Sequence, residues 1–221
     1  MPFRISLSTA DLLGLLSTLL ALWFSLPQLV RLARTRSTAG VSLGSLANSL
    51  VSLTAWALYG AAHGYVWVVA GSLVGVPATV ATLVLARRDG ARLRLLAPAS
   101  WAGLLVVAAA ASVLVTPAVL DVAIGSSVLW LVVPAAWYAW RSSDVSGIAP
   151  QTWLVLAVEA SVFGAYGWVA GVGADRVYGV VALAGSAVVL ARLAVARGDR
   201  RPMAEVRPLP DGTGELEPVA A

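Results

Sequence analysis

The sequence predicts an all-α membrane protein with seven transmembrane helices. Of the 221 residues, 59% are hydrophobic and only 12% are charged, and the mean hydropathy is +0.86, whereas a soluble domain is about 25% charged. The apolar residues gather in long stretches that short arginine-bearing loops separate. An internal repeat divides the predicted helices into two parallel three-helix units joined by one linker helix, a 3+1+3 arrangement. A water-soluble fold is excluded.

The composition also excludes several kinds of chemistry. All 15 basic residues are arginines, there is no cysteine, and His63 is the single histidine. Without lysine no retinal or pyridoxal Schiff base forms, and without cysteine there is no disulfide or thiolate nucleophile. One histidine does not build a multi-histidine metal or haem site. We therefore expect no metal and no cofactor. The net charge of +4 does not indicate a nucleic-acid partner, because the arginines lie between apolar stretches.

Seven stretches are long enough to span a bilayer, since a helix needs roughly 20 apolar residues to cross about 30 Å of hydrocarbon. The predicted spans are 10–30, 43–64, 66–86, 96–115, 119–139, 149–170 and 177–196. Only Arg4 precedes the first span, while Arg31, Arg34 and Arg36 follow it. This is the reverse of a signal peptide's charge pattern, so we expect the first span to be retained.

The arginines predict the orientation of the chain. Thirteen of the 15 lie in loops or segments on one side of the predicted membrane, and only Arg4 and Arg176 lie on the other. The positive-inside rule therefore places the N-terminus outside and the C-terminus in the cytoplasm. Residues 198–221 mix Pro, Gly and both charge signs and are predicted to be a disordered cytoplasmic tail. The absence of lysine is typical of a GC-rich bacterial genome, so we expect the cytoplasmic membrane of a bacterium.

A shift of 107 positions reveals the internal repeat. The superposed pairs include Trp23 with Trp130, Pro27 with Pro134, Tyr59 with Tyr166 and Gly64 with Gly171. So many matches in register indicate a duplicated unit. We predict a first repeat over 10–88, a linker helix over 95–116 and a second repeat over 119–197. Two three-helix units are parallel only if one more crossing lies between them, and parallel repeats of this kind occur in transporters.

One segment of the chain is similar to a known family. Residues 25–43 read SLPQLVRLARTRSTAGVSL, and Trp56-Ala-Leu-Tyr59-Gly60 follows. This segment resembles the PQ-loop family, which includes SWEET and SemiSWEET sugar transporters and the cystine transporter cystinosin. The second copy is a weaker match, because Ala135 follows Pro134 where the motif has glutamine. Together the copies and their linker cover residues 10–197. The resemblance implies a seven-helix transporter with a substrate cavity between two three-helix bundles.

Proline positions indicate where the bundles would bend. Pro27 and Pro134 lie inside predicted spans, where each removes a backbone hydrogen bond. We interpret them, with Gln28 and Pro150, as hinges on which each bundle rocks, and a kink that serves only packing is the alternative. The resemblance implies a ring of four prolines around the cavity, and this chain has Gly44 near the fourth place.

The second helix of each unit carries a polar and aromatic stripe with a spacing of three or four residues. The stripe comprises Ser45, Asn48, Ser52, Trp56 and Tyr59, with Thr152, Val155, Glu159, Phe163 and Tyr166 as counterparts. Residues at this spacing share one helix face. We expect this face to line the substrate cavity, because lipid would reject it. The predicted cavity residues are Trp23, Asn48, Ser52, Trp56, Ser72, Ser126, Trp130, Glu159 and Phe163.

Glu159 is the predicted proton-coupling residue. It lies about ten residues into its span and so near the bilayer centre, where an ionised carboxylate costs roughly 3 kcal/mol or more. We expect it to be protonated at rest, hydrogen-bonded to Ser52, Asn48 or Ser126, and to release its proton when the cavity fills with water. Cation binding is a related interpretation. A permanently protonated carboxyl that bridges two helices is the alternative.

Two tryptophans, and the absence of an asparagine from the third predicted helix, indicate which class of solute is favoured. Trp23 and Trp130 lie one turn before Pro27 and Pro134, and they either clamp a flat solute or pack between helices. Sugar-transporting relatives typically place an asparagine in the third helix of each unit, whereas this chain has Ala-Gly-Ser at 70–72. Sugar is therefore not the favoured substrate. His63 is interpreted as a solvated loop histidine, with a pH sensor as the alternative.

We expect a transporter that moves a small polar solute by alternating access, with an amino acid or cationic solute favoured over sugar. Proton coupling is favoured over uniport. A membrane receptor or scaffold that binds without translocating is the alternative. No enzymatic activity is expected, because Glu159 is the only acid near the bilayer centre. The expected partners are the solute and the lipid bilayer, and the sequence leaves open whether the chain forms a homo-oligomer.

Overall fold

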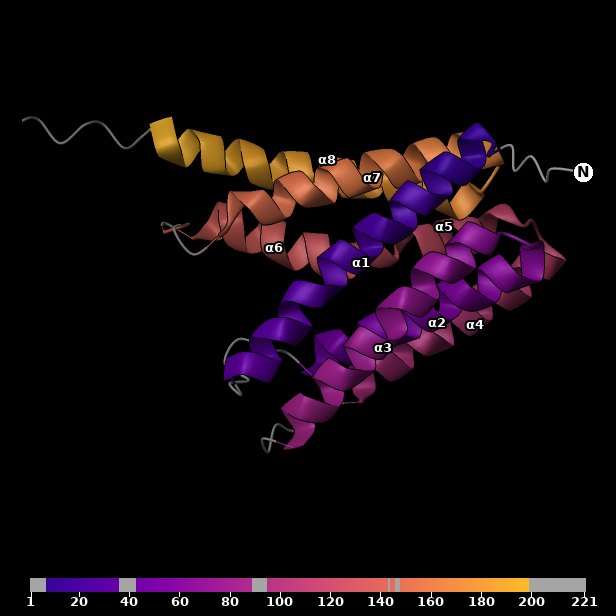
Figure 1. Ribbon diagram of the computed structural model, residues 1–221, viewed down its shortest axis with the longest axis horizontal. Helices are drawn as coiled ribbons and strands as arrows, with labels where there is room; N and C mark the ends of the chain where they lie inside the picture. The colour runs from indigo at the N-terminus through magenta and orange to yellow at the C-terminus, as the bar shows by residue number, and fades with distance from the viewer. Residues whose placement is uncertain (1–6, 36–42, 89–94, 143, 146–147, 199–221) are drawn as a thin grey trace, which may run out of the picture.

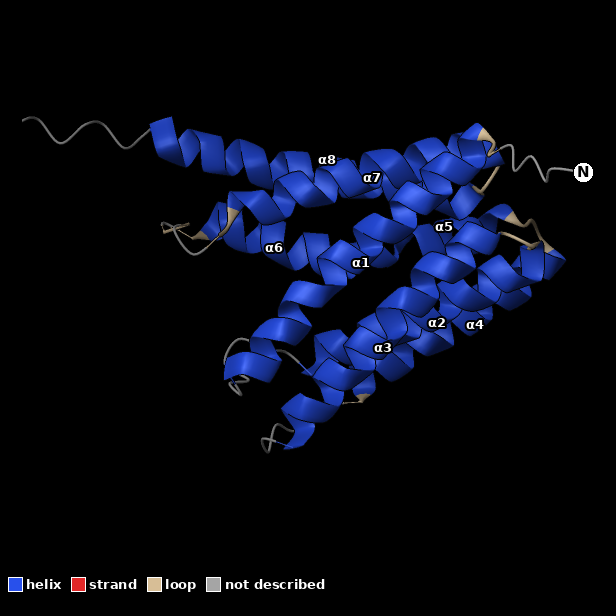
Figure 2. Ribbon diagram, in the orientation of Figure 1, coloured by secondary structure: helices blue, strands red, loops and turns tan. Residues whose placement is uncertain are grey.

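A computed structural model describes residues 7–35, 43–88, 95–142, 144–145 and 148–198. Within these ranges all regular secondary structure is helical, which confirms the predicted all-α class (Figure 2). Helices satisfy every backbone hydrogen bond within one segment, as a lipid environment requires. Apart from Gly198, which ends the last helix, the predicted tail lies outside the described residues.

The helices form seven long segments in the described ranges. They are α1 (Thr9–Thr35), α2 (Leu43–His63), α3 (Val66–Arg88), α4 (Leu96–Leu114), α5 (Ala118–Gly125) with the 3₁₀ turn η1 (Ser126–Val128) and α6 (Leu129–Arg141), α7 (Pro150–Ala170) and α8 (Gly173–Gly198). We treat α5, η1 and α6 as one segment because they follow one another without a gap. The last helix begins four residues before the predicted span at 177, with Asp175 in its first turn.

Five of these segments are long and apolar enough to cross a membrane. They are α3, α4, the α5–α6 segment, α7 and α8 as far as Ala196. Helix α2 is not among them, because its serine, threonine and asparagine side chains lower its hydropathy. The described apolar stretch of α1, Thr9–Trp23, is shorter than a span. The finding supports a multi-pass membrane protein.

The first half (α1–α3) and the second half (α5–α8) have the same packing order. Helix α3 packs against both α1 and α2, and α8 packs against the α5–α6 segment and α7. The halves meet where α1 packs against α7 and where α2 approaches α5. Helix α4 packs against both α2 and α5. In each half, therefore, the third helix touches the other two, and the first helix of one half meets the second helix of the other.

Two glycines that the 107-residue shift superposes form equivalent turns. Gly64 follows α2 with φ 74° and Gly171 follows α7 with φ 78°. Glycine adopts this left-handed conformation without the steric cost that a side chain brings. These turns lie at the same end of the molecule, called here the turn end (right in Figure 1). The opposite end, where Arg34, Arg88 and Arg141 lie, is called the arginine end.

Among the described side chains, the buried core is shared between the halves at the turn end and divided at the arginine end. At the turn end one cluster joins Tyr59 of α2 and Val68 of α3 to Tyr166 of α7 and Ala174 of α8. Towards the arginine end, Leu43, Leu46 and Ala86 form a cluster of the first half alone, and a separate cluster belongs to the second half. Figure 1 shows the helices of the two halves diverging towards this end.

Candidate functional site

The polar stripe of α2 faces α4 and the second half. The indole Nε1 of Trp101, in α4, donates a hydrogen bond to Ser52 Oγ at 2.9 Å. The indole of Trp56 donates to Ser127 Oγ of η1 at 3.2 Å. The Tyr59 hydroxyl donates to Asp121 Oδ1 of α5 at 2.6 Å. The stripe therefore lies in the contact between the halves, and three of its polar groups already bond to protein.

Trp56 and its counterpart Phe163 converge on one residue of the third helix in the second half. The ring of Trp56 meets the ring of Tyr178 edge-on, with centroids 6.0 Å apart, and Phe163 lies 5.4 Å from the same ring. Sequence reasoning missed Tyr178, although a tyrosine inside an otherwise apolar helix is a signal that would have found it.

Two buried polar atoms on the stripes lack a hydrogen-bond partner within the ranges that the structure describes. Glu159 is 6% exposed, and its Oε2 has no hydrogen-bond partner among the described residues. Asn48, on α2, is also buried, and its Oδ1 is likewise without a described partner. Ser52, one of the predicted partners of Glu159, is instead bonded by Trp101. An unpaired buried polar group costs roughly 1–3 kcal/mol, so each of these two enclosed atoms would gain from a hydrogen bond in a conformer that exposes it.

The remaining predicted serines differ in their surroundings. Ser72 of α3 is buried, and its hydroxyl donates to the carbonyl of Val68 at 2.8 Å. Such a bond to the preceding turn satisfies the hydroxyl within its own helix. Ser126 begins η1 and is half-buried. Thus Ser72 has a partner in its own helix, whereas Asn48 Oδ1 and Glu159 Oε2 have none in the described part of the chain.

The predicted tryptophan pair lies apart from this arrangement. Trp23 is 69% exposed and Trp130 is 48% exposed, and no described ring contact joins them. Trp130 instead meets Trp101 edge-on, at 5.9 Å between centroids. Trp101 thus links Ser52 to Trp130 from α4, a helix to which the sequence analysis assigned only a linking role. A tryptophan in the second turn of an otherwise apolar helix was the available signal.

The predicted hinge residues occupy different helix positions. Pro134 lies inside α6, and Pro150 is the first residue of α7, where its missing N–H costs no helical hydrogen bond. Pro27 and Gln28 fall within α1, and their side chains lie outside the described part of the chain. The α5–α6 segment departs from regular α-helix at η1, about two turns before Pro134. A 3₁₀ stretch inside a helix often marks a hinge.

Polar and aromatic groups gather at the turn end. Trp67 Nε1 donates to Asp11 Oδ1 at 3.0 Å, which joins α3 to α1. His63 is exposed at the end of α2, its Nδ1 lies 2.9 Å from the Tyr59 carbonyl, and its ring stacks on Tyr65. Asp175 is fully buried in the first turn of α8, and neither of its carboxyl oxygens has a described partner. Sequence reasoning did not single out Asp175 or Asp121.

The comparison with known families matches the first half of the chain. The family model described as PQ loop repeat matches residues 9–69, from α1 to the start of α3. The matched range contains the residues 25–43 and Trp56 to Gly60 on which the resemblance was based, and it confirms that resemblance. The second copy lies outside the matched range. The searches of curated proteins and of solved structures found no match.

Proposed function

From the PQ-loop repeat at residues 9–69, we propose that this membrane protein is a transporter that moves a small polar solute by alternating access. The seven helical segments act as two parallel three-helix bundles, with α4 as the linker between them. The common packing order of the halves and the equivalent glycine turns support this arrangement. An amino acid or cationic solute is the favoured cargo.

The observation that carries the proposal is the pair of polar atoms at Glu159 and Asn48 that have no hydrogen-bond partner among the described residues. They lie on the stripes of the two counterpart helices, α7 and α2, and both residues are buried. A solute with hydrogen-bond donors would supply the missing partners. Trp56, Phe163 and Tyr178 would provide an aromatic wall for it, to which a cationic group is also attracted.

The divided core supports a cycle in which the two ends open in turn. In the present arrangement the halves share a core at the turn end and have separate cores at the arginine end. The positive-inside rule would make the arginine end cytoplasmic, so this conformer would be open to the cytoplasm. The Tyr59–Asp121 hydrogen bond joins α2 of one half to α5 of the other, and it would break when the turn end opens.

Glu159 would couple solute movement to protons. A carboxyl group in the hydrocarbon region is far less costly when neutral. A water-filled cavity would allow it to ionise and bind a cationic group, and a return to the dry state would require a proton. Because one carboxylate carries the cationic group and the proton in turn, the proposal includes exchange of solute for proton, in the cytoplasmic membrane of a bacterium, with no covalent chemistry.

Solute uptake into proteoliposomes tests the function. Purified full-length protein would be reconstituted and given labelled amino acids, cationic amines and sugars, with and without an imposed proton gradient. We expect gradient-stimulated uptake of an amino acid or a cationic solute. Absence of flux for every solute at every pH would overturn transport in favour of a receptor or scaffold.

The variant Glu159→Gln tests the coupling. We expect it to reduce uptake to the level measured without a gradient and to remove the pH dependence, because an amide does not exchange a proton. Ser161→Ala is a matched control on α7, since Ser161 is exposed and bonds only to the Ala157 carbonyl of its own helix. An unchanged pH dependence in Glu159→Gln would remove the coupling role while leaving transport in place.

A further inference from the structure

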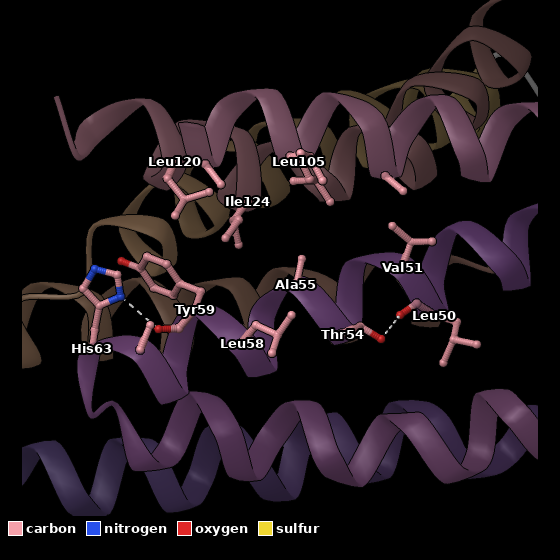
Figure 3. Close-up of a pocket in the computed structure, with 14 residues that line it drawn as sticks. Leu50, Val51, Thr54, Ala55, Leu58, Tyr59, His63, Leu105, Leu120 and Ile124 are labelled. Carbon is pink, nitrogen blue, oxygen red and sulfur yellow. Dashed lines mark hydrogen bonds between the residues drawn. The ribbon is translucent and has the colours of Figure 1, made fainter. Parts of the chain in front are cut away.

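We propose that an acyl chain of a membrane phospholipid binds in a groove between α2, α4 and α5, separate from the solute site. The groove has a volume of about 600 Å³ (Figure 3), which lies within the range of roughly 300–1,000 Å³ typical of ligand pockets. All but three of its lining residues are aliphatic. Leu105 and Ile124 form a buried floor, and Leu58, which is 66% exposed, forms part of the wall.

The three polar residues of the groove are already hydrogen-bonded. Thr54 Oγ1 donates to the Leu50 carbonyl at 2.8 Å, and the Tyr59 hydroxyl donates to Asp121. His63 Nδ1 pairs with the Tyr59 carbonyl at the end of α2 (Figure 3). Water needs two to four polar partners to occupy a cavity, and the aliphatic length of this groove does not supply them. The occupant is therefore apolar, unlike the solute of the proposed function.

The position and shape of the groove identify an acyl chain. Helix α4, which forms one wall, is among the segments able to span a membrane, so the groove opens towards hydrocarbon. Its lining residues on α2 run from Leu50 to His63, which is about 20 Å at 1.5 Å per residue. This length exceeds the roughly 15 Å depth of one leaflet's hydrocarbon. The polar ring of His63, stacked on Tyr65, lies at one end, so the groove matches an amphiphile with a long apolar part and a polar end.

The lining joins the two halves of the molecule. Tyr59 belongs to α2, whereas Leu120 and Ile124 belong to α5. An acyl chain in the groove thus contacts both sides of the Tyr59–Asp121 bond and favours the conformer in which the turn end is closed, because a ligand stabilises the state that it binds best. Binding itself requires only the groove, while an effect on uptake rests on the proposed function.

Photolabelling tests the binding. Detergent-solubilised full-length protein would be titrated with phosphatidylcholine that carries a diazirine on one acyl chain, illuminated and mapped by peptide mass spectrometry. We expect saturable labelling of α2 and α4 residues that line the groove. Unlabelled long-chain phosphatidylcholine should compete, and dihexanoyl phosphatidylcholine should not, because its chains are too short to fill the groove.

Two variant pairs distinguish the groove from the neighbouring surface. Ala109 on α4 and Ala62 on α2 line the groove, whereas their exposed neighbours Ala110 and Ala61 do not. We expect Ala109→Trp and Ala62→Trp each to weaken the saturable labelling by about tenfold, since excluding only two methylene groups suffices for that loss. Ala110→Trp and Ala61→Trp should leave it unchanged. Thermal unfolding of all four variants identifies any that misfold.

Three outcomes would overturn the proposal. Labelling that never saturates would show annular lipid only. Saturable labelling that is unchanged in both Ala109→Trp and Ala62→Trp would place the lipid elsewhere. Absence of groove labelling in a protein that migrates as a dimer in size-exclusion chromatography would show that a second copy covers the groove. Saturable, variant-sensitive labelling of a protein that moves no solute would refute the proposed function alone.

Discussion

The second helices of the two halves, α2 and α7, share a fold position but not their chemistry. Both end in a buried tyrosine followed by a glycine turn, and both pack against the third helix of their half. On α2 the groups of Ser52, Trp56 and Tyr59 bond to protein partners, whereas the counterpart of Ser52 is Glu159, whose Oε2 has no described partner. The two helices therefore share the buried tyrosine and the glycine turn, whereas the polar side chains at the other counterpart positions differ.

The helix α4 accounts for part of this difference. It packs against α2 and supplies Trp101 to Ser52. The position equivalent to Ser52 in the second half is the one at which a carboxyl group is buried. The hydrogen bond from Trp101 therefore distinguishes Ser52 of α2 from its counterpart Glu159 of α7.

The largest expected effect concerns the contact between α7 and α8, the second and third helices of the second half. A Cβ atom at Gly179 would lie 2.7 Å from Gly164 Cα and 2.9 Å from the Ala160 carbonyl oxygen, both of which are backbone atoms. We expect Gly179→Ala to lower the free energy of unfolding by about 3 kcal/mol, the upper end of overpacking costs. Thermal unfolding in detergent measures it.

Two alanine variants are the comparison for Gly179→Ala. At Gly60, in the first half, the nearest atoms belong to the Val68 and Val69 side chains at 3.0–3.1 Å, so a shift of a few tenths of an ångström relieves the contact and we expect a smaller loss. At Gly103, on α4, no atom of a described residue lies within 4 Å of an added Cβ, and we expect no loss. Equal losses of unfolding free energy in Gly179→Ala and Gly60→Ala would show that the α7–α8 and α2–α3 contacts are equally tight.

The next effect concerns the bond that joins the halves at the turn end. Tyr59→Phe leaves Asp121 Oδ1 without its partner, which we expect to cost about 2 kcal/mol and to shift the population towards a wider turn end. The chain has no cysteine, so spin labels at Ala61→Cys and Val169→Cys report the distance between α2 and α7 by pulsed electron resonance.

The counterpart variant Tyr166→Phe is the control for Tyr59→Phe. Tyr166 is equally buried, but no hydrogen bond of its hydroxyl is present among the described residues. We expect the spin-label distance distribution of Tyr166→Phe to match that of the unmodified chain. A shift of the same size in both variants would assign the effect to ring packing rather than to the Asp121 bond.

The smallest effect concerns α4. Trp101→Phe keeps an aromatic ring beside Trp130 but removes the hydrogen bond to Ser52, which we expect to cost about 1 kcal/mol of unfolding free energy. In the double variant with Ser52→Ala the further loss should be small, because the two changes remove the same bond. Additive losses in this double-mutant cycle would contradict the pairing.

Long apolar helices and their approximate limits were predictable from the sequence, because hydropathy and span length are local properties. The start of α8 at Gly173 was missed by four residues, since Asp175 in the first turn interrupts the apolar run. The stripe on α2 was predictable from spacing. Its partners were not, because Trp101, Asp121 and Ser127 lie 49, 62 and 71 positions away along the chain.

The sequence by itself determined the helical class, the membrane environment, the PQ-loop repeat over 9–69 and the equivalent turns at Gly64 and Gly171, because each depends on composition or on short-range spacing. Only the tertiary structure decided that Ser52 bonds to Trp101, that Trp56 and Phe163 meet at Tyr178, and that Glu159 Oε2 lacks a described partner. Helix periodicity defines which side chains share a face, but the rotation and neighbours of that face are set by the packing of all the helices together.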